Sequence, residues 1–301
     1  MTPSTAASPL PEVRYSAESS PRSSLHHLLR VYRLPGLLRR HRVMLKHFVG
    51  RELRGRFADN LLGPLWVLLH PVFLFAVYFL VFTQIQRTGA GADSVWFACY
   101  LFSGLICFHF ITQSTAQAMN AIVANGNIVK KVKFPCEVLP IVPALVEIAV
   151  FGLGLVIVAI VGFASGRASL DPALFALPWF LLVLITFAVG IGMLLANLIV
   201  FVRDVAPLYG LITTAWFFLS PNFWTPNFFG TETLIGKALQ FNPTYHLLLA
   251  ERQVLGLARE DAGFTGSVVG NLGIASAWAA LFLALGYGGF MAHKHKYADL
   301  V

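Results

Sequence analysis

Six long stretches of this chain carry almost no charged side chains, and they limit its fold more than any other feature. They are residues 60–86, 94–129, 138–166, 172–202, 205–231 and 262–293, and the single charge within them is Glu147. A helix needs about 20 mostly apolar residues to cross the hydrocarbon core of a membrane. Each stretch is long enough, so the sequence predicts an all-α integral membrane protein with six transmembrane helices.

The predicted spans are residues 63–82, 95–118, 139–163, 173–202, 207–219 and 268–292. The fourth span is long, so we expect it to tilt or to extend beyond the hydrocarbon. The connector between the fifth and sixth spans contains two shorter apolar pieces, residues 234–241 and 245–257, separated by proline. Pieces this short are typical of re-entrant or interfacial helices, and we expect them on the outer side of the membrane.

The basic residues predict which ends of the spans face the cytoplasm. The net charge is +8, and lysines and arginines cluster before the first span, between the second and third, and after the fourth and sixth. Positive residues are retained on the cytoplasmic side, so both termini are predicted to be cytoplasmic. The charge excess is thus a signal of membrane orientation, and we expect no nucleic-acid partner.

The residues before the first span divide into two segments. Residues 1–24 are rich in Ser, Pro and Ala, which predicts a disordered tail. Residues 25–59 form a basic segment at the cytoplasmic interface, in which Leu45, Val49, Leu53 and Phe57 recur every fourth residue. A basic amphipathic helix of this kind lies flat on a membrane. No apolar run precedes the first span, so we expect no cleavable signal peptide.

The remainder of the chain contains no recognisable catalytic motif. Residues 230–238 come nearest to a P-loop, but their glycine spacing is one residue too long, and Ala238 stands where Ser or Thr should hold Mg²⁺. No Cys/His metal cluster is present, and we interpret Cys99, Cys107 and Cys136 as apolar packing residues. The sequence predicts no metal and no cofactor bound by this chain.

Several motifs resemble those of one family. Residues 51–82 combine a basic helix with Leu62-Gly63, Leu65-Trp66 and Pro71, and a second stretch, NIVKKVKFPCEVLP, covers residues 127–140. Further matching positions are Asn197, Arg203, Asp204, Asn242, Pro243 and Arg252. Together they resemble the ABC-2 type permeases that export O-antigen, capsule and teichoic acid polysaccharides. The resemblance covers residues 45–296, so residues 60–292 are predicted to form the ABC-2 type transmembrane domain and residues 293–301 a basic cytoplasmic tail.

The resemblance implies a transport subunit of the bacterial inner membrane with no enzymatic activity of its own. Two copies would form a homodimer, and each would dock a separate ATPase subunit that binds ATP and Mg²⁺. The cargo would be a polysaccharide on a polyprenyl-pyrophosphate or another lipid anchor.

Two groups of basic residues are candidate sites. Arg51, Arg54 and Arg56 hold the interfacial helix on anionic lipid or bind the pyrophosphate of the substrate through their forked guanidinium groups, and Gly63 allows the turn into the first span. The loop between the second and third spans either anchors the chain to lipid phosphates or seats in a cleft of the ATPase. Its candidate residues are Asn127, Lys130, Lys131, Lys133 and Phe134.

Other candidates lie within or near the spans. Aromatic residues at the outer ends form an ordinary interfacial belt or a stacking surface for sugar rings; the channel candidates are Tyr78, Phe82, Trp96, Tyr100 and Trp224. Glu147 is expected to pair with a polar group on a neighbouring helix or to face the channel. Gln117 and Asn197 are candidate hydrogen-bond partners between helices.

Three alternative functions remain open at this point. One is an ABC-2 permease for a drug or a free lipid. Another is an integral-membrane polyprenyl-lipid transferase, which would need paired acids or a metal near the interface, where the nearby cytoplasmic acids are Asp59, Glu137 and Asp204. The last is a proton-coupled transporter, which would depend on Glu147.

Overall fold

The computed structural model describes residues 31–32, 34–57, 94–131, 135–166, 171–230, 232–264 and 266–300, together with several positions between 65 and 80. Within these ranges all regular secondary structure is helical, as predicted. The predicted tail, residues 1–24, lies outside the described residues, as does most of the first predicted span.

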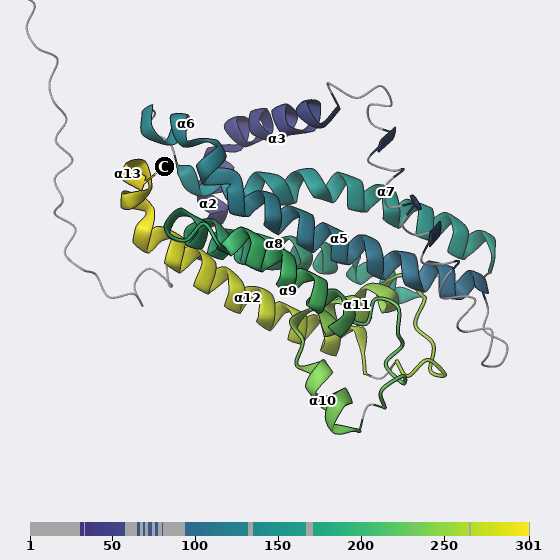
Figure 1. The fold of residues 1–301 in the computed structure, drawn as a ribbon. Helices are drawn as coiled ribbons and strands as arrows, with labels where there is room; N and C mark the ends of the chain where they lie inside the picture. The colour runs from purple at the N-terminus through teal and green to yellow at the C-terminus, as the bar shows by residue number, and fades with distance from the viewer. Residues whose placement is uncertain are drawn as a thin grey trace, which may run out of the picture.

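Four long helices form the body of the molecule (Figure 1). They are α5 (Ser94–Ala124), α7 (Val142–Ala164), α8 (Leu177–Phe201) and α12 (Val268–His293), and α8 packs against both α5 and α12. All four are long and apolar enough to cross a membrane. They confirm the helices predicted for the second, third, fourth and sixth spans, with the length and apolar composition that a crossing needs. The fifth predicted span corresponds to α9 (Val205–Leu219), whose 15 residues are short for a crossing, so the total of six spans stays a prediction.

The second predicted span continues further than expected. α5 extends to Ala124 because residues 119–124 are still mostly apolar and contain no glycine or proline. The helix ends at Asn125, whose side-chain amide donates to the Ala121 carbonyl over 2.9 Å. The short helix α6 (Gly126–Lys131) follows this turn.

Proline determines how the third and fourth spans begin. The 3₁₀ helices η2 (Cys136–Ile141) and η3 (Pro172–Ala176) precede α7 and α8, and both α-helices have proline in their first turn. The Asp171 carboxylate caps η3 by accepting from the Ala173 N–H over 2.8 Å. The long fourth predicted span is therefore divided between a 3₁₀ turn and α8.

The connector between α9 and α12 contains the two short helices that the sequence predicts, α10 (Leu234–Gln240) and α11 (Pro243–Val254). Both lie at the end of the bundle opposite α6 and α13 (Tyr297–Leu300) (Figure 1). α11 is buried along most of its length against α12, α5 and α8, whereas α10 exposes Leu234 and Ile235. Their depth in the membrane stays a prediction.

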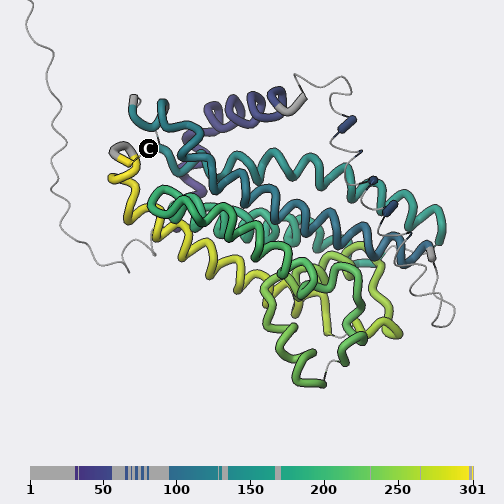
Figure 2. The backbone as a smooth tube through the Cα atoms, in the orientation of Figure 1, coloured from purple at the N-terminus to yellow at the C-terminus, as the bar shows by residue number. Residues whose placement is uncertain are grey.

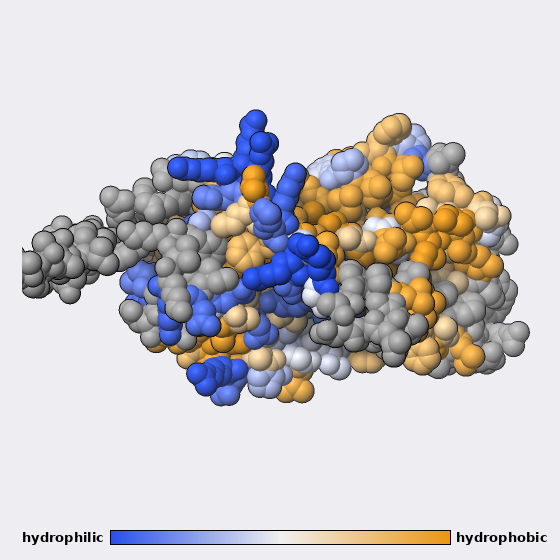
Figure 3. Space-filling model, turned by 90° about the horizontal axis from the view of Figure 1, so that it is seen from above, coloured by the Kyte–Doolittle hydropathy of each residue, from blue (hydrophilic) through white to orange (hydrophobic). Residues whose placement is uncertain are grey.

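The predicted interfacial segment forms α2 (Leu34–Arg40) and α3 (Arg42–Phe57), and α3 packs alongside α7. Leu45, Val49 and Leu53 are half-buried while Arg42 and Lys46 are exposed, as the stripe predicts. Figure 3 shows hydrophilic side chains gathered over α3 and a mainly hydrophobic surface toward the far end of α7. Exposed apolar side chains on α7, such as Leu153 and Ile160, suit contact with lipid.

Candidate functional site

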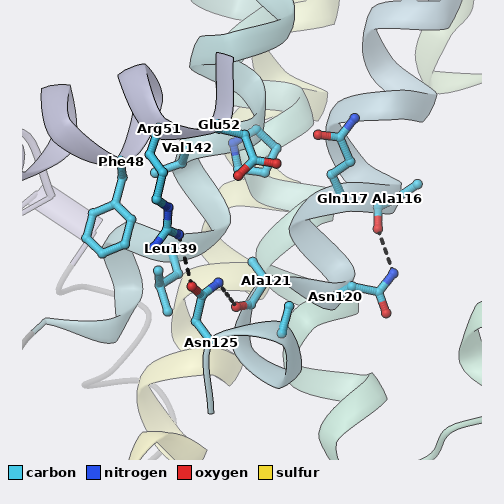
Figure 4. A pocket seen from close by; sticks show the side chains of 12 residues that line it. Phe48, Arg51, Glu52, Ala116, Gln117, Asn120, Ala121, Asn125, Leu139 and Val142 are labelled. Atoms are coloured by element: carbon cyan, nitrogen blue, oxygen red, sulfur yellow. Dashed lines mark hydrogen bonds between the residues drawn. The ribbon is translucent and has the colours of Figure 1, made fainter. Parts of the chain in front are cut away.

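A pocket of about 410 Å³ lies where α3 crosses the bundle (Figure 4). It sits at the end of the bundle that carries α6, because its walls come from the last turns of α5 and the first turns of α7. The lining residues are Phe48, Arg51 and Glu52 of α3; Ala116, Gln117, Asn120, Ala121 and Ala124 of α5, followed by Asn125; and Leu139 of η2 with Val142 and Pro143 of α7.

Arg51 is the cation of this pocket. Its guanidinium donates to the Asn125 side-chain oxygen over 3.1 Å and lies 4.8 Å from the centre of the Phe48 ring. Arg54 lies elsewhere, because its Nε donates to the Gly50 carbonyl of its own helix over 3.0 Å. The structure therefore separates Arg51 from Arg54, while the Arg56 side chain and Gly63 lie outside what it describes.

The pocket combines polar and apolar walls. One guanidinium, one carboxylate and three side-chain amides face the same space as Phe48, Leu139 and Val142. Such a lining can hold the head of an amphiphile: arginine binds phosphate oxygens through two parallel N–H groups, and the apolar wall accepts the adjoining hydrocarbon. Sequence reasoning identified Arg51 but missed Glu52, Asn120 and Asn125.

Glu147 lies directly behind the pocket. It is 2% exposed on α7, and the Gln117 amide of α5 donates to its Oε1 over 2.9 Å. This is the pairing between neighbouring helices that the sequence suggests for an acid within a span. Gln117 thus belongs to the pocket wall and to the α5–α7 contact at once.

The candidate coupling loop forms the helix α6. Asn127 and Lys130 are exposed on it, Lys131 is its last residue, and Lys133 and Phe134 lie outside the described residues. α6 contacts α13, so this loop and the C-terminal segment lie at the same end of the bundle (Figure 2). That arrangement agrees with the predicted topology, in which both face one side of the membrane.

Three of the aromatic candidates are buried at the opposite end of the bundle. Trp96, Tyr100 and Trp224 are 7%, 0% and 5% exposed. The Tyr100 hydroxyl donates to the Trp224 carbonyl over 2.6 Å, and the Trp96 indole donates to a backbone carbonyl over 2.9 Å. These rings therefore pack the connector between α9 and α12 against α5. Sugar stacking on them stays a prediction, and it requires the rings to become exposed. Tyr78 and Phe82 lie outside the described residues.

Two of the three acids that a transferase could use lie among the described residues. Glu137 forms an ion pair of 2.6 Å with Lys294, Asp204 is exposed just before α9, and Asp59 lies outside the described residues. In the part of the chain that the structure describes, no group of three or more His, Cys, Asp or Glu side chains could hold a metal ion.

The comparison with protein families decides whether the chain is an ABC-2 permease, a transferase or a proton-coupled transporter. The family described as ABC-2 type transporter matches residues 44–255. The chain belongs to the ABC-2 type transporter family. The match runs from α3 to the end of α11, so both the pocket and α6 are parts of the transporter domain. It confirms the resemblance recognised from Arg51–Pro71 and from the loop that forms α6.

Curated relatives of this ABC-2 transporter carry one name. A protein named O-antigen export system permease protein RfbA from Myxococcus xanthus is 27% identical over 270 residues, which cover 89% of this chain and 99% of the relative. Two proteins of the same name from Klebsiella pneumoniae are 20% identical over 211 residues, which cover 70% of this chain and 79% of each relative.

Proposed function

We propose that this chain is the permease subunit of an ATP-driven exporter that moves a lipid-linked polysaccharide of the O-antigen type from the cytoplasm across the bacterial inner membrane. The observation that carries the proposal is the similarity to the Myxococcus xanthus O-antigen export permease along nearly the whole of that protein. The four long apolar helices and the family match support a multi-pass transporter.

In this proposal the working unit is a homodimer with two separate ATPase subunits. The sequence has no P-loop, so ATP and Mg²⁺ would bind to the partner. α6 is the proposed docking element, since Asn127 and Lys130 are exposed on it and it stands at one end of the bundle. Both termini would then face the cytoplasm, where ATP is present.

The pocket beside α3 is the proposed binding site for the phosphate-bearing head of the lipid anchor. Arg51 supplies the positive charge beside the Glu52 carboxylate, and the amides of Gln117, Asn120 and Asn125 supply further donors. A forked cation next to hydrocarbon would bind a pyrophosphate more tightly than it would bind an uncharged drug. This feature favours a phosphorylated lipid substrate over the alternatives of a drug or a neutral lipid.

The test compares Arg51 with Arg54 in a reconstituted system. The permease is co-expressed and purified with a candidate ATPase subunit and placed in vesicles with a fluorescent polyprenyl-pyrophosphate glycan. We expect Arg51→Ala to raise the substrate concentration for half-maximal transport by about tenfold, the effect of losing a charge-assisted hydrogen bond of about 1.4 kcal/mol. Arg54→Ala is the matched control and should change the substrate concentration for half-maximal transport by less than about twofold.

The outcomes separate the possibilities. If no ATPase binds to the purified permease, the proposal is wrong. Equal effects of Arg51→Ala and Arg54→Ala would indicate that both arginines act only on bulk lipid, and the pocket would lose its assigned role. Transport of an uncharged lipid at the same rate as the pyrophosphate lipid would favour the alternative of a free-lipid permease.

A further inference from the structure

The C-terminal segment folds back onto the bundle. Tyr297 is completely buried, and its hydroxyl donates to the Asn197 side-chain oxygen of α8 over 2.9 Å. Burial raises the pKa of this hydroxyl, so it remains a donor at every physiological pH. Around the ring lie apolar side chains from four other elements; they are Ala121, Ile122, Cys136, Leu139, Ala196 and Phe290.

A second attachment lies one turn earlier. The Lys294 ammonium is 2.6 Å from Oε2 of Glu137, whose side chain is only 5% exposed. Removing the lysine would leave a buried carboxylate without this partner, which costs far more than breaking an exposed ion pair. Lys294 therefore ties the end of α12 to η2, the turn that leads from the α6 loop into α7.

The Tyr297 attachment reaches α6. A helix of six residues is too short to be stable by itself, so neighbouring elements must hold it in position. The elements that contact α6 most are α13 and α5, and Val129 of α6 packs against the cluster that contains Tyr297. Residues remote in the sequence thus hold the exposed face that carries Asn127 and Lys130.

We propose that residues 294–300 form a C-terminal clasp that fixes α6 to α8 and η2. This inference rests on the proposed function, in which α6 docks the ATPase. Movement of α6 would then reach α8 through the contact of Tyr297 with Asn197. It would reach η2, and the start of α7 that follows it, through the contact of Lys294 with Glu137. Lys294 and Tyr297 are positioning residues in this scheme, because they act through α6 and need not touch the ATPase themselves.

Cys136 provides a readout that is independent of transport. It is 4% exposed and belongs to the same cluster as Tyr297. With Cys99 and Cys107 replaced by alanine, Cys136 is the only remaining cysteine, and its reaction with a maleimide reports opening of the clasp. We expect Lys294→Ala and Tyr297→Phe to raise the labelling rate at least about tenfold, as when a buried polar group loses its partner. Lys296→Ala, two residues from Lys294 and exposed, should leave the rate unchanged.

A second measurement tests the effect on coupling. In vesicles with the ATPase, Lys294→Ala should lower the amount of glycan moved per ATP hydrolysed by about tenfold, while the ATPase remains bound. Lys294→Arg, which keeps the charge, should restore the ratio.

Unchanged labelling in both Lys294→Ala and Tyr297→Phe would overturn the clasp. Faster labelling with an unchanged ratio would overturn its role in positioning α6 for transport. If no ATPase binds even the parent protein, the proposed function fails, and the labelling rates alone decide whether the clasp holds α6.

Discussion

Gly190 of α8 and Gly286 of α12 face each other so closely that neither position has room for a methyl group. A Cβ atom on Gly190 would lie 2.6 Å from the carbonyl carbon of Phe282 and 2.9 Å from the Cα of Leu283. A Cβ on Gly286 would lie 3.1 Å from the carbonyl carbon of Gly190. These neighbours are backbone atoms, which cannot turn aside as a side chain can. Small residues allow this close approach of helices in a membrane.

Alanine at either glycine should therefore loosen the bundle. We expect Gly190→Ala and Gly286→Ala each to lower the free energy of unfolding by about 1–3 kcal/mol, the usual cost of overpacking. The measurement is the melting temperature in detergent. Gly273→Ala on α12 is the control, since a Cβ there meets nothing within 4 Å. A similar loss at all three positions would contradict close packing as the cause, because alanine alone favours the helix over glycine.

Arg252 should be essential to the seating of α11. Its guanidinium donates to the carbonyls of Pro221, Asn222 and Tyr100 over 2.6, 3.0 and 3.3 Å and lies 3.6 Å from the centre of the Tyr100 ring. We expect Arg252→Ala to destabilise the protein by about 2–4 kcal/mol, and Arg252→Lys to recover only part of this because lysine lacks the planar fork.

Arg259 gives the matched comparison for thermal unfolding. It lies 4.7 Å from the centre of the Trp96 ring and is half-buried. Arg259→Ala should cost about 1 kcal/mol or less. A cost as large as that of Arg252→Ala would contradict the special role of the buried arginine.

Glu251 should make stability depend on pH. It is fully buried in α11. Burial raises the pKa of this carboxyl from 4.5 to about 8, against the opposing effects of Arg252 and Cys107. The folded protein then holds a proton that the unfolded chain releases. The contribution of this proton to the free energy of unfolding is fully present below pH 4.5 and is lost as the pH rises to about 8.

Glu251→Gln should remove this dependence. We expect the variant to be more stable than the parent at about pH 9 and nearly equal to it at about pH 5, as judged from melting temperatures in detergent. Glu260→Gln, at an exposed position, should leave the dependence intact. An unaltered pH profile in Glu251→Gln would show that another group is responsible.

Glu147 is predicted to act through its contact with Gln117 and not as a proton carrier. Glutamine at position 147 can still accept from the Gln117 amide, so Glu147→Gln should keep ATP-driven transport within about twofold, with no pH gradient imposed. Glu147→Ala removes the bond and should destabilise the protein by about 1–3 kcal/mol. Transport that is abolished in a stable Glu147→Gln protein would instead support a proton relay.

The sequence predicts the long helices well because membrane crossing depends on a property of consecutive residues. A run of about 20 apolar side chains is visible without any knowledge of neighbours. The burial of α11 is not visible in this way. The sequence predicts residues 245–257 as a short apolar helix but does not show what surrounds Glu251 and Arg252. The carbonyls of Pro221, Asn222 and Tyr100 accept from the buried arginine.

The pocket and the clasp also depend on contacts between residues far apart in the sequence, which a single sequence does not reveal. Arg51 was identified by its charge, but its partner Asn125 is 74 positions away, and nothing in a single sequence indicates that pairing. The C-terminal residues were predicted only as a basic tail, because Lys294 and Lys296 dominate their composition. Tyr297 gains its role from Asn197, 100 positions earlier, and such contacts appear only once the helices are assembled.

The glycine contact between α8 and α12 also bears on how the protein is made. α8 is synthesised before α9, the outer connector and α12, so it enters the bilayer without the neighbour that covers Gly190. Until α12 arrives, the surface around Gly190 lacks the backbone that covers it in the folded protein. A substitution that widens α12 at this contact would therefore hinder the docking of the last long helix during biogenesis, and not only the stability of the finished bundle.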